Sequence, residues 1–233
     1  MMKKLHFIAQ AKGGVGKSLL MYLFALKNHK DPSCLFVDLD SSTHTTKRQL
    51  GFVKEENLDS VSLLDEKGLL IRDNLISYLE ALAKTDFDHI YFDLGAPESE
   101  QLPALMQFDL PLDSFAYLLD FKIIFHVVIG GGGAYNASVD YLIKMEEVTG
   151  KKFLINVWQS MATFRKFPHL AQELHENCLN AGLNCYGFGD FEPESYLGSQ
   201  ILAGVRQGIG IDEFTTGPKL RLQRELEINF DHV

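Results

Sequence analysis

A glycine-rich segment near the start of the chain most constrains the fold. Residues 11–18 read AKGGVGKS. An apolar run, Leu5 to Ala9, precedes this segment, and a helix-forming run, LLMYLFALK, follows it. A strand, a glycine loop and a helix in this order form a phosphate-binding unit. The strict phosphate-loop pattern has Gly at the position of Ala11, whereas the variant KGGxGK followed by Ser or Thr is fully met.

The positions of this loop have separable physical roles. Glycines lack a Cβ, so the backbone can adopt positive φ and turn successive N–H groups toward a polyphosphate. Lys17 is expected to contact the β and γ phosphates, and the Ser18 hydroxyl to be a ligand of Mg²⁺. The predicted nucleotide-binding residues of the loop are Gly13, Gly14, Val15, Gly16, Lys17, Ser18 and Leu19.

Further short apolar runs alternate with amphipathic helical patterns along the chain. The runs are typical of buried parallel strands and cover Cys34 to Val37, His89 to Phe92, Ile123 to Ile129, Phe153 to Val157 and Leu183 to Phe188. This order predicts an α/β fold with an open, mostly parallel sheet and helices on both faces. We expect one domain over residues 1–233, with its ligand crevice at the carboxyl ends of the strands.

Charge and cysteine content narrow the partners and the compartment. The formal net charge is −9, so the chain as a whole is repelled by nucleic acid and by anionic lipid. DNA binding would need a local basic patch, and no membrane contact is expected. Three scattered cysteines form no disulfide framework, and the first residues have no signal-peptide pattern. We therefore expect a cytoplasmic protein.

Polar residues lie at or near the ends of several predicted strands. Asp38 and Asp40 follow the second apolar run, and Asp93 follows the third. Carboxylates in these places face the crevice, and Asp93 is suited to hold Mg²⁺ through water. Asn156 lies within or near the end of a later strand, where its amide could cap a turn and can both donate and accept hydrogen bonds.

With its additional lysine, Lys12, the loop resembles the deviant Walker A ATPases of the ParA and MinD group. The resemblance implies ATP and Mg²⁺ as cofactors, a homodimer formed on ATP binding, and slow hydrolysis stimulated by a protein partner. It implies that Lys12 reaches the phosphates of the other subunit and that Asp40 orients the attacking water. It further implies that Asn156 reads the adenine edge, as an Asn does in several relatives. It also implies Mg²⁺ contacts for Ser18, Asp38 and Asp93, and a process such as plasmid partition, conjugative transfer or intracellular positioning.

The chain departs from the family pattern at three places. Ser41 and Ser42 replace the usual Pro-Gln, Gly95 replaces a proline, and Gly130 to Gly133 stand where relatives tend to have a Thr-Pro turn. Two other functions therefore stay open. One is an ATP-gated binding module with little hydrolysis, and the other is a small-molecule kinase or ligase on the same fold, which would not need Lys12.

Overall fold

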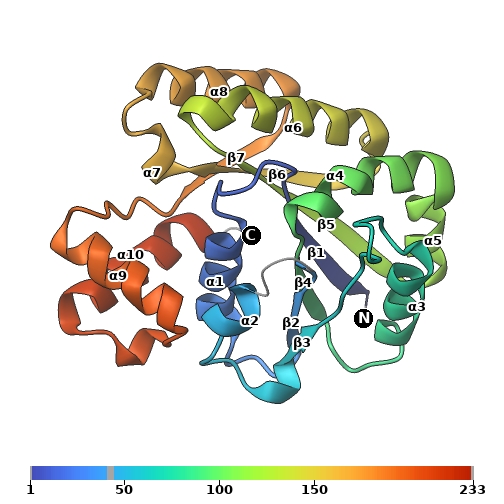
Figure 1. The fold of residues 1–233 in the computed structure, drawn as a ribbon, viewed down its shortest axis with the longest axis horizontal. Coiled ribbons are helices and arrows are strands. Elements are labelled where there is room, and N and C mark those ends of the chain that lie inside the picture. The colour runs from blue at the N-terminus through green and yellow to red at the C-terminus, as the bar shows by residue number, and fades with distance from the viewer. Residues whose placement is uncertain (1, 41–44, 232–233) are drawn as a thin grey trace.

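A seven-stranded parallel sheet organises the chain (Figure 1). The computed structural model describes residues 2–40 and 45–231. The strand order is β3-β2-β4-β1-β5-β6-β7, and every neighbouring pair is parallel. The strands are β1 (Lys3–Ala9), β2 (Cys34–Asp38), β3 (Leu58–Ser60), β4 (His89–Asp93), β5 (Phe121–Ile129), β6 (Leu154–Ser160) and β7 (Asn184–Phe188).

Helices connect the strands and cover both faces of the sheet. The α-helices are α1 (Lys17–Asn28), α2 (Thr45–Gln49), α3 (Arg72–Leu82), α4 (Ala96–Ala104), α5 (Leu112–Leu118), α6 (Tyr135–Thr149), α7 (Met161–Phe164), α8 (Pro168–Ala181), α9 (Tyr196–Gln207) and α10 (Thr216–Phe230). Short 3-10 turns are η1 (Glu55–Asn57), η3 (Gly132–Ala134) and η4 (Ile211–Glu213), and η2 (Leu105–Asp109) is a π-helical turn. None of the helices in the described ranges has the length and apolarity needed to cross a membrane.

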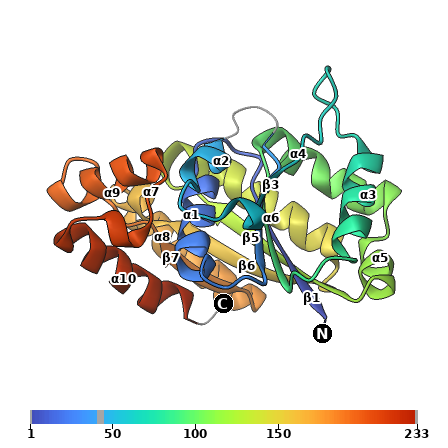
Figure 2. The same ribbon diagram turned by 90° about the horizontal axis from the view of Figure 1, so that it is seen from below.

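The two faces of the sheet bury separate cores. Helices α1, α9 and α10 pack on one face, and α3, α4, α5, α6 and α8 pack on the other (Figures 1 and 2). Strand β2 is buried along its whole length because helices cover both of its sides. This explains why continuous apolar runs, rather than alternating ones, marked the strands in the sequence.

The predicted fold class is confirmed. All six apolar runs become strands, and the structure adds β3, a three-residue edge strand. The sequence LDS in β3 has no apolar run, so nothing in its local pattern indicated a strand. Its place is set by pairing with β2, where Phe36 lies opposite Leu58.

The parallel arrangement brings the carboxyl ends of β1, β2 and β4 to one edge of the sheet. Asp38 at the end of β2 is the register partner of Asp93 at the end of β4. Asp93 in turn pairs with Ile8, two residues before the chain leaves β1 for the glycine loop. Segments that are far apart in the sequence therefore meet at this edge.

Candidate nucleotide site

The glycine loop connects the end of β1 to the start of α1. Gly14 has φ 76° and Gly16 has φ 107°, in the left-handed region that glycine adopts without strain. A Cβ at Gly13 or Gly14 would meet nothing within 4 Å, whereas a Cβ at Gly16 would lie 3.3 Å from the ring of Phe188. The N–H groups of Gly13 and Gly14 have no hydrogen-bond acceptor among the described residues. The loop thus offers open space and available donors beside a helix N-terminus.

Lys17 is buried in the first turn of α1 and points back over the loop. Its Nζ donates to the backbone oxygen of Gln10 at 2.9 Å, and the side chain is 9% exposed. Burial lowers the pKa of Lys17, while the charges of Asp93, Asp40 and Glu98 act to raise it. One ammonium group therefore lies within the field of three carboxylates.

Strands β2 and β4 place two carboxylates side by side. Asp38 and Asp93 are each 1% exposed. Asp38 accepts hydrogen bonds from the backbone N–H groups of Asp40 at 3.0 Å and Lys47 at 3.1 Å, so its carboxylate ties α2 to the end of β2. Ser41 and Ser42, which lie between Asp40 and Lys47 in the sequence, are outside the described residues.

Asp93 has the surroundings expected of a cation ligand. The Thr46 hydroxyl donates to its Oδ2, while its Oδ1 is buried and has no hydrogen-bond partner within the described ranges. Burial raises the pKa of Asp93 to about 6, and the hydroxyls of Thr46 and Ser18 and the Lys17 ammonium act to lower it. Carboxylate and hydroxyl oxygens are the ligands that Mg²⁺ prefers. The donors present therefore fit Mg²⁺.

Glu98 is a fourth acid that the sequence analysis missed. It lies in α4, is fully buried, and contributes to the charge around Lys17. A Cβ added at Gly95 would lie 2.1 Å from Glu98 Oε2 and 2.9 Å from Asp40 Oδ1. Because Gly95 has no side chain, it leaves room for these two carboxylates. The sequence offered one indication of Glu98, its position five residues after Asp93. That indication is weak, because acids are common in the first turn of a helix.

The remaining loop residues divide between exposed and buried. Lys12 is exposed, and its backbone N–H donates to the side-chain oxygen of Gln10 at 3.1 Å. Val15 is 2% exposed and lies where a Cβ on Gly130 would come within 2.8 Å of it. Leu19 is half-buried, and a Cβ on Gly189 would lie 3.0 Å from it. Of the seven predicted loop residues, the structure brings Lys17 and Ser18 together with Asp38, Asp40 and Asp93.

Asn156 is not brought to this group. Strand β6 continues four residues beyond it, so Asn156 lies inside the strand, 3% exposed, where its Oδ1 accepts from Asn184 Nδ2 at 3.3 Å. The predicted contact between Asn156 and a base therefore has no support from its position. The amide near the strand's carboxyl end belongs to Gln159, which is 9% exposed with an Nε2 that has no partner in the described part of the chain.

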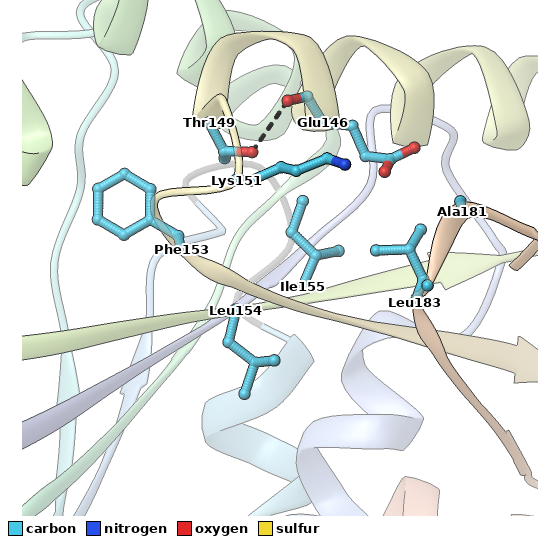
Figure 3. Close-up of a pocket in the computed structure, with 9 residues that line it drawn as sticks. Glu146, Thr149, Lys151, Phe153, Leu154, Ile155, Ala181 and Leu183 are labelled. Carbon is cyan, nitrogen blue, oxygen red and sulfur yellow. Dashed lines mark hydrogen bonds between the residues drawn. The ribbon is translucent and has the colours of Figure 1, made fainter. Parts of the chain in front are cut away.

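A separate pocket lies at the other end of β6 (Figure 3). Its volume is about 370 Å³, and the residues around it include Glu146, Lys151, Phe153 and Ile155. Beside it the Thr149 hydroxyl donates to the Glu146 backbone oxygen at 3.1 Å. The amino-terminal end of a parallel strand is the edge opposite the glycine loop, so this pocket is not part of the candidate site.

Solved structures share this arrangement of strands and helices. The MinC:MinD cell division protein complex of Aquifex aeolicus matches with a TM-score of 0.55 and 14% identity, covering 96% of this chain and 95% of that one. A plasmid partition protein of Borrelia burgdorferi, bound to AMPPNP, matches with a TM-score of 0.56 and 17% identity over 97% of each chain. The fold is that of the ParA and MinD ATPases. At these identities the likeness concerns the ParA and MinD fold alone.

Curated relatives are similar in sequence over part of the chain. Two Escherichia coli proteins, each named Protein TraL, are 27% identical over 167 residues and 25% identical over 169 residues. Each match covers 67% of this chain and 63% of the TraL protein. No family model matches the chain.

Proposed function

We propose that this chain is a Mg²⁺-dependent ATPase of the ParA and MinD type, in which ATP binding drives dimerisation and slow hydrolysis returns the monomer. One observation carries the proposal. The Lys17 ammonium lies in the field of Asp40 and Asp93 beside a glycine loop with open space and available N–H donors. The relative from Borrelia burgdorferi solved with AMPPNP supports a nucleotide as the ligand.

Triphosphate binding is assigned to the loop and to Lys17. The N–H groups of Gly13 and Gly14 and the positive end of α1 attract the phosphates, and Lys17 exchanges its contact with the Gln10 oxygen for phosphate oxygens. Ser18, Asp38 and Asp93 would hold Mg²⁺. A bound Mg²⁺ would offset the growing negative charge on the phosphates.

Hydrolysis is assigned to Asp40, which we propose orients the attacking water. Asp40 lies beside Glu98 at Gly95, and both carboxylates act on the charge of Lys17. A carboxylate that is packed beside a buried acid and attracted by a buried ammonium is restricted in position, and restricted geometry favours an aligned water. Glu98 acts as a positioning residue in this scheme.

The exposed amine of Lys12 is assigned to the partner subunit's phosphates. A cation that reaches the phosphates only on pairing makes hydrolysis depend on dimerisation. Lys12→Ala is expected to bind ATP as a monomer with affinity within about threefold of wild type and to lose the ATP-dependent dimer, because only the contact in trans is removed. Light scattering with ADP and with a slowly hydrolysed ATP analogue measures both states.

Asp40→Ala is the matched control, and its expected effect on the dimer is the opposite of that of Lys12→Ala. It keeps both lysines, so it is expected to form the dimer and to retain it with ATP itself, because hydrolysis is slowed. A Lys12→Ala protein that dimerises and hydrolyses ATP normally would contradict the role in trans. A wild-type protein that stays monomeric with the analogue would contradict dimerisation as a whole.

Gly95→Ala is expected to reduce hydrolysis by about 10- to 100-fold with little change in the KM for ATP, because an added methyl group displaces Asp40 and Glu98. The overpacking should cost about 1–3 kcal/mol of unfolding free energy. Phosphate release under single-turnover conditions and urea denaturation measure the two effects. Gly133→Ala is the control, since a Cβ there meets nothing within 4 Å. Equal rates of hydrolysis for Gly95→Ala and Gly133→Ala would contradict a role of Asp40 and Glu98 in hydrolysis.

The cellular setting is proposed from the comparisons and from charge. Plasmid partition, conjugative transfer and intracellular positioning are the processes considered, and a protein partner is expected to stimulate hydrolysis. The net charge of −9 disfavours strong DNA affinity. We propose a cytoplasmic protein that acts without inserting into a membrane.

A further inference from the structure

Gln10, the residue between β1 and the glycine loop, has hydrogen bonds to five segments of the fold. It is fully buried. Its Nε2 donates to the backbone oxygens of Val128 at 2.8 Å and Ser138 at 3.2 Å, and its Oε1 accepts from the Lys12 N–H at 3.1 Å. Two acceptors and one donor around the amide fix which end is oxygen and which is nitrogen.

The backbone of Gln10 is occupied as well. Its N–H donates to Ser99 Oγ in α4 at 3.1 Å, and its oxygen accepts from Lys17 Nζ at 2.9 Å. Gln10 thus contacts Lys12 in the loop, Lys17 at the start of α1, the end of β5, the first turn of α6, and the helix that carries Glu98. A buried amide with every group paired restricts its neighbours strongly, since each broken bond would leave a buried polar group unsatisfied.

The glycines after β5 belong to the same unit. The Ser138 hydroxyl donates to the Ala134 oxygen at 2.8 Å and accepts from the Gly130 N–H at 3.4 Å. A Cβ on Gly130 would lie 2.8 Å from Val15, inside normal contact distance. The loop that follows β5 is therefore packed against the glycine loop and is also held to it through Gln10. This close approach accounts for a glycine at position 130.

We propose that Gln10 is a positioning residue that fixes the backbone at Lys12 and so sets where the exposed Lys12 amine points. The inference rests on the proposed function for the use made of that amine. Neighbouring Gly13 and Gly14 have no comparable bond from their N–H groups among the described residues. The Lys12 side chain therefore extends from a fixed backbone position, and the backbone of the two following glycines can adjust to a ligand.

The chain offers a matched control at the amino end of β2. Asn57 is 4% exposed, and its Nδ2 donates to the backbone oxygens of Pro32 at 3.1 Å and Cys34 at 2.7 Å. It is a buried amide that bridges two carbonyl groups, as Gln10 is, but it lies at the sheet edge opposite the loop. Gln10→Met and Asn57→Leu each remove such a bridge, so a general loss of stability affects both.

The first test is amide hydrogen exchange by NMR on the ligand-free protein. In wild type the Lys12 amide is expected to exchange at least about tenfold more slowly than the Gly13 and Gly14 amides, because within residues 2–40 and 45–231 it is the one of the three that donates a hydrogen bond. Gln10→Met should abolish that difference, and Asn57→Leu should keep it. Equal exchange at the three positions in wild type would overturn the proposal without any variant, so a Gln10→Met protein that fails to fold leaves it testable.

The second test measures dimerisation with the slowly hydrolysed ATP analogue by light scattering. Gln10→Met should need at least about tenfold more protein for half-dimerisation while ADP affinity stays within about threefold, and Asn57→Leu should match wild type in both. If wild type does not dimerise, the proposed function fails and hydrogen exchange alone decides the role of Gln10. If Lys12→Ala loses the dimer while Gln10→Met keeps it, Gln10 does not position Lys12 and the proposed function stands.

Discussion

Lys17→Ala is expected to bind MgATP about 100-fold more weakly than wild type. Removing one partner of a desolvated charged contact costs about 3 kcal/mol, which is roughly a factor of 100 in affinity. The substitution also leaves Asp40, Asp93 and Glu98 without the ammonium that acts on them. Titration with a fluorescent ATP analogue at fixed Mg²⁺ measures the affinity.

Lys12→Ala is the matched control for this titration. Lys12 in the glycine loop is exposed, whereas Lys17 at the start of α1 is 9% exposed. Monomer affinity should therefore fall for Lys17→Ala and stay near wild type for Lys12→Ala. An affinity for Lys17→Ala within threefold of wild type would mean that the triphosphate lies elsewhere.

Three buried or half-buried histidines in neighbouring strands are expected to make stability sensitive to acid. Trp158 Nε1 donates to His126 Nδ1 at 2.9 Å, and because indole is only a donor, His126 carries its proton on Nε2. That proton is donated to His6 Nδ1 at 3.0 Å, and His6 Nε2 lies 3.4 Å from His89 Nδ1. Neutral rings satisfy the whole chain of bonds, and a second proton on His126 or His6 would break it.

Burial lowers the pKa of His126 to about 3, and burial together with the charges of His126 and His89 lowers the pKa of His6 well below its usual value. Below about pH 6.5 the unfolded chain takes up protons that the native state excludes, so stability is lost as pH falls. His126 alone contributes a loss of about 1.4 kcal/mol per pH unit, or roughly 2 kcal/mol at about pH 5. Asp93 acts in the opposite direction, because its raised pKa lets the native state take up a proton near pH 6 as pH falls.

The contribution of His126 is isolated by comparing wild type with His126→Gln in urea denaturation between about pH 7 and about pH 5. The advantage of wild type over the variant should shrink by roughly 2 kcal/mol over this range, since Asp93 is common to both proteins. His175→Gln, at an exposed position in α8, should follow wild type at every pH. A difference between wild type and His126→Gln that does not change with pH would contradict a neutral, buried His126.

Local patterns predicted the sheet and most residues of the candidate site, because a strand, a glycine loop and the acids at strand ends are each encoded by adjacent residues. Glu98 and Gln10 were missed for the opposite reason. Their roles depend on Gly95, Lys17, Val128 and Ser138, which the fold brings together from different segments. Nothing in the local sequence distinguishes a functional acid in a helix, or a functional amide at a strand end, from an ordinary polar surface residue.

Asn156 shows that a small error in a predicted strand boundary can place a side chain wrongly at the end of a strand. The apolar run predicted a strand ending at Val157, but the strand continues through Trp158 and two polar residues to Ser160, and all three pair with β7. Pairing across the sheet, rather than the local pattern, sets that boundary. The histidines were not recognised either, since a bond between His6 and His126 spans 120 residues of sequence.

The attachment of α2 to the two acids allows movements of the candidate site to be followed by fluorescence. Its Thr46 hydroxyl contacts Asp93, and its Lys47 N–H contacts Asp38, so this short helix is fastened to both acids at once. The Lys47 side chain itself is exposed. An environment-sensitive dye coupled to a cysteine at that position would sit outside the site yet follow any shift of the acids, allowing cation and nucleotide arrival to be timed by stopped-flow fluorescence.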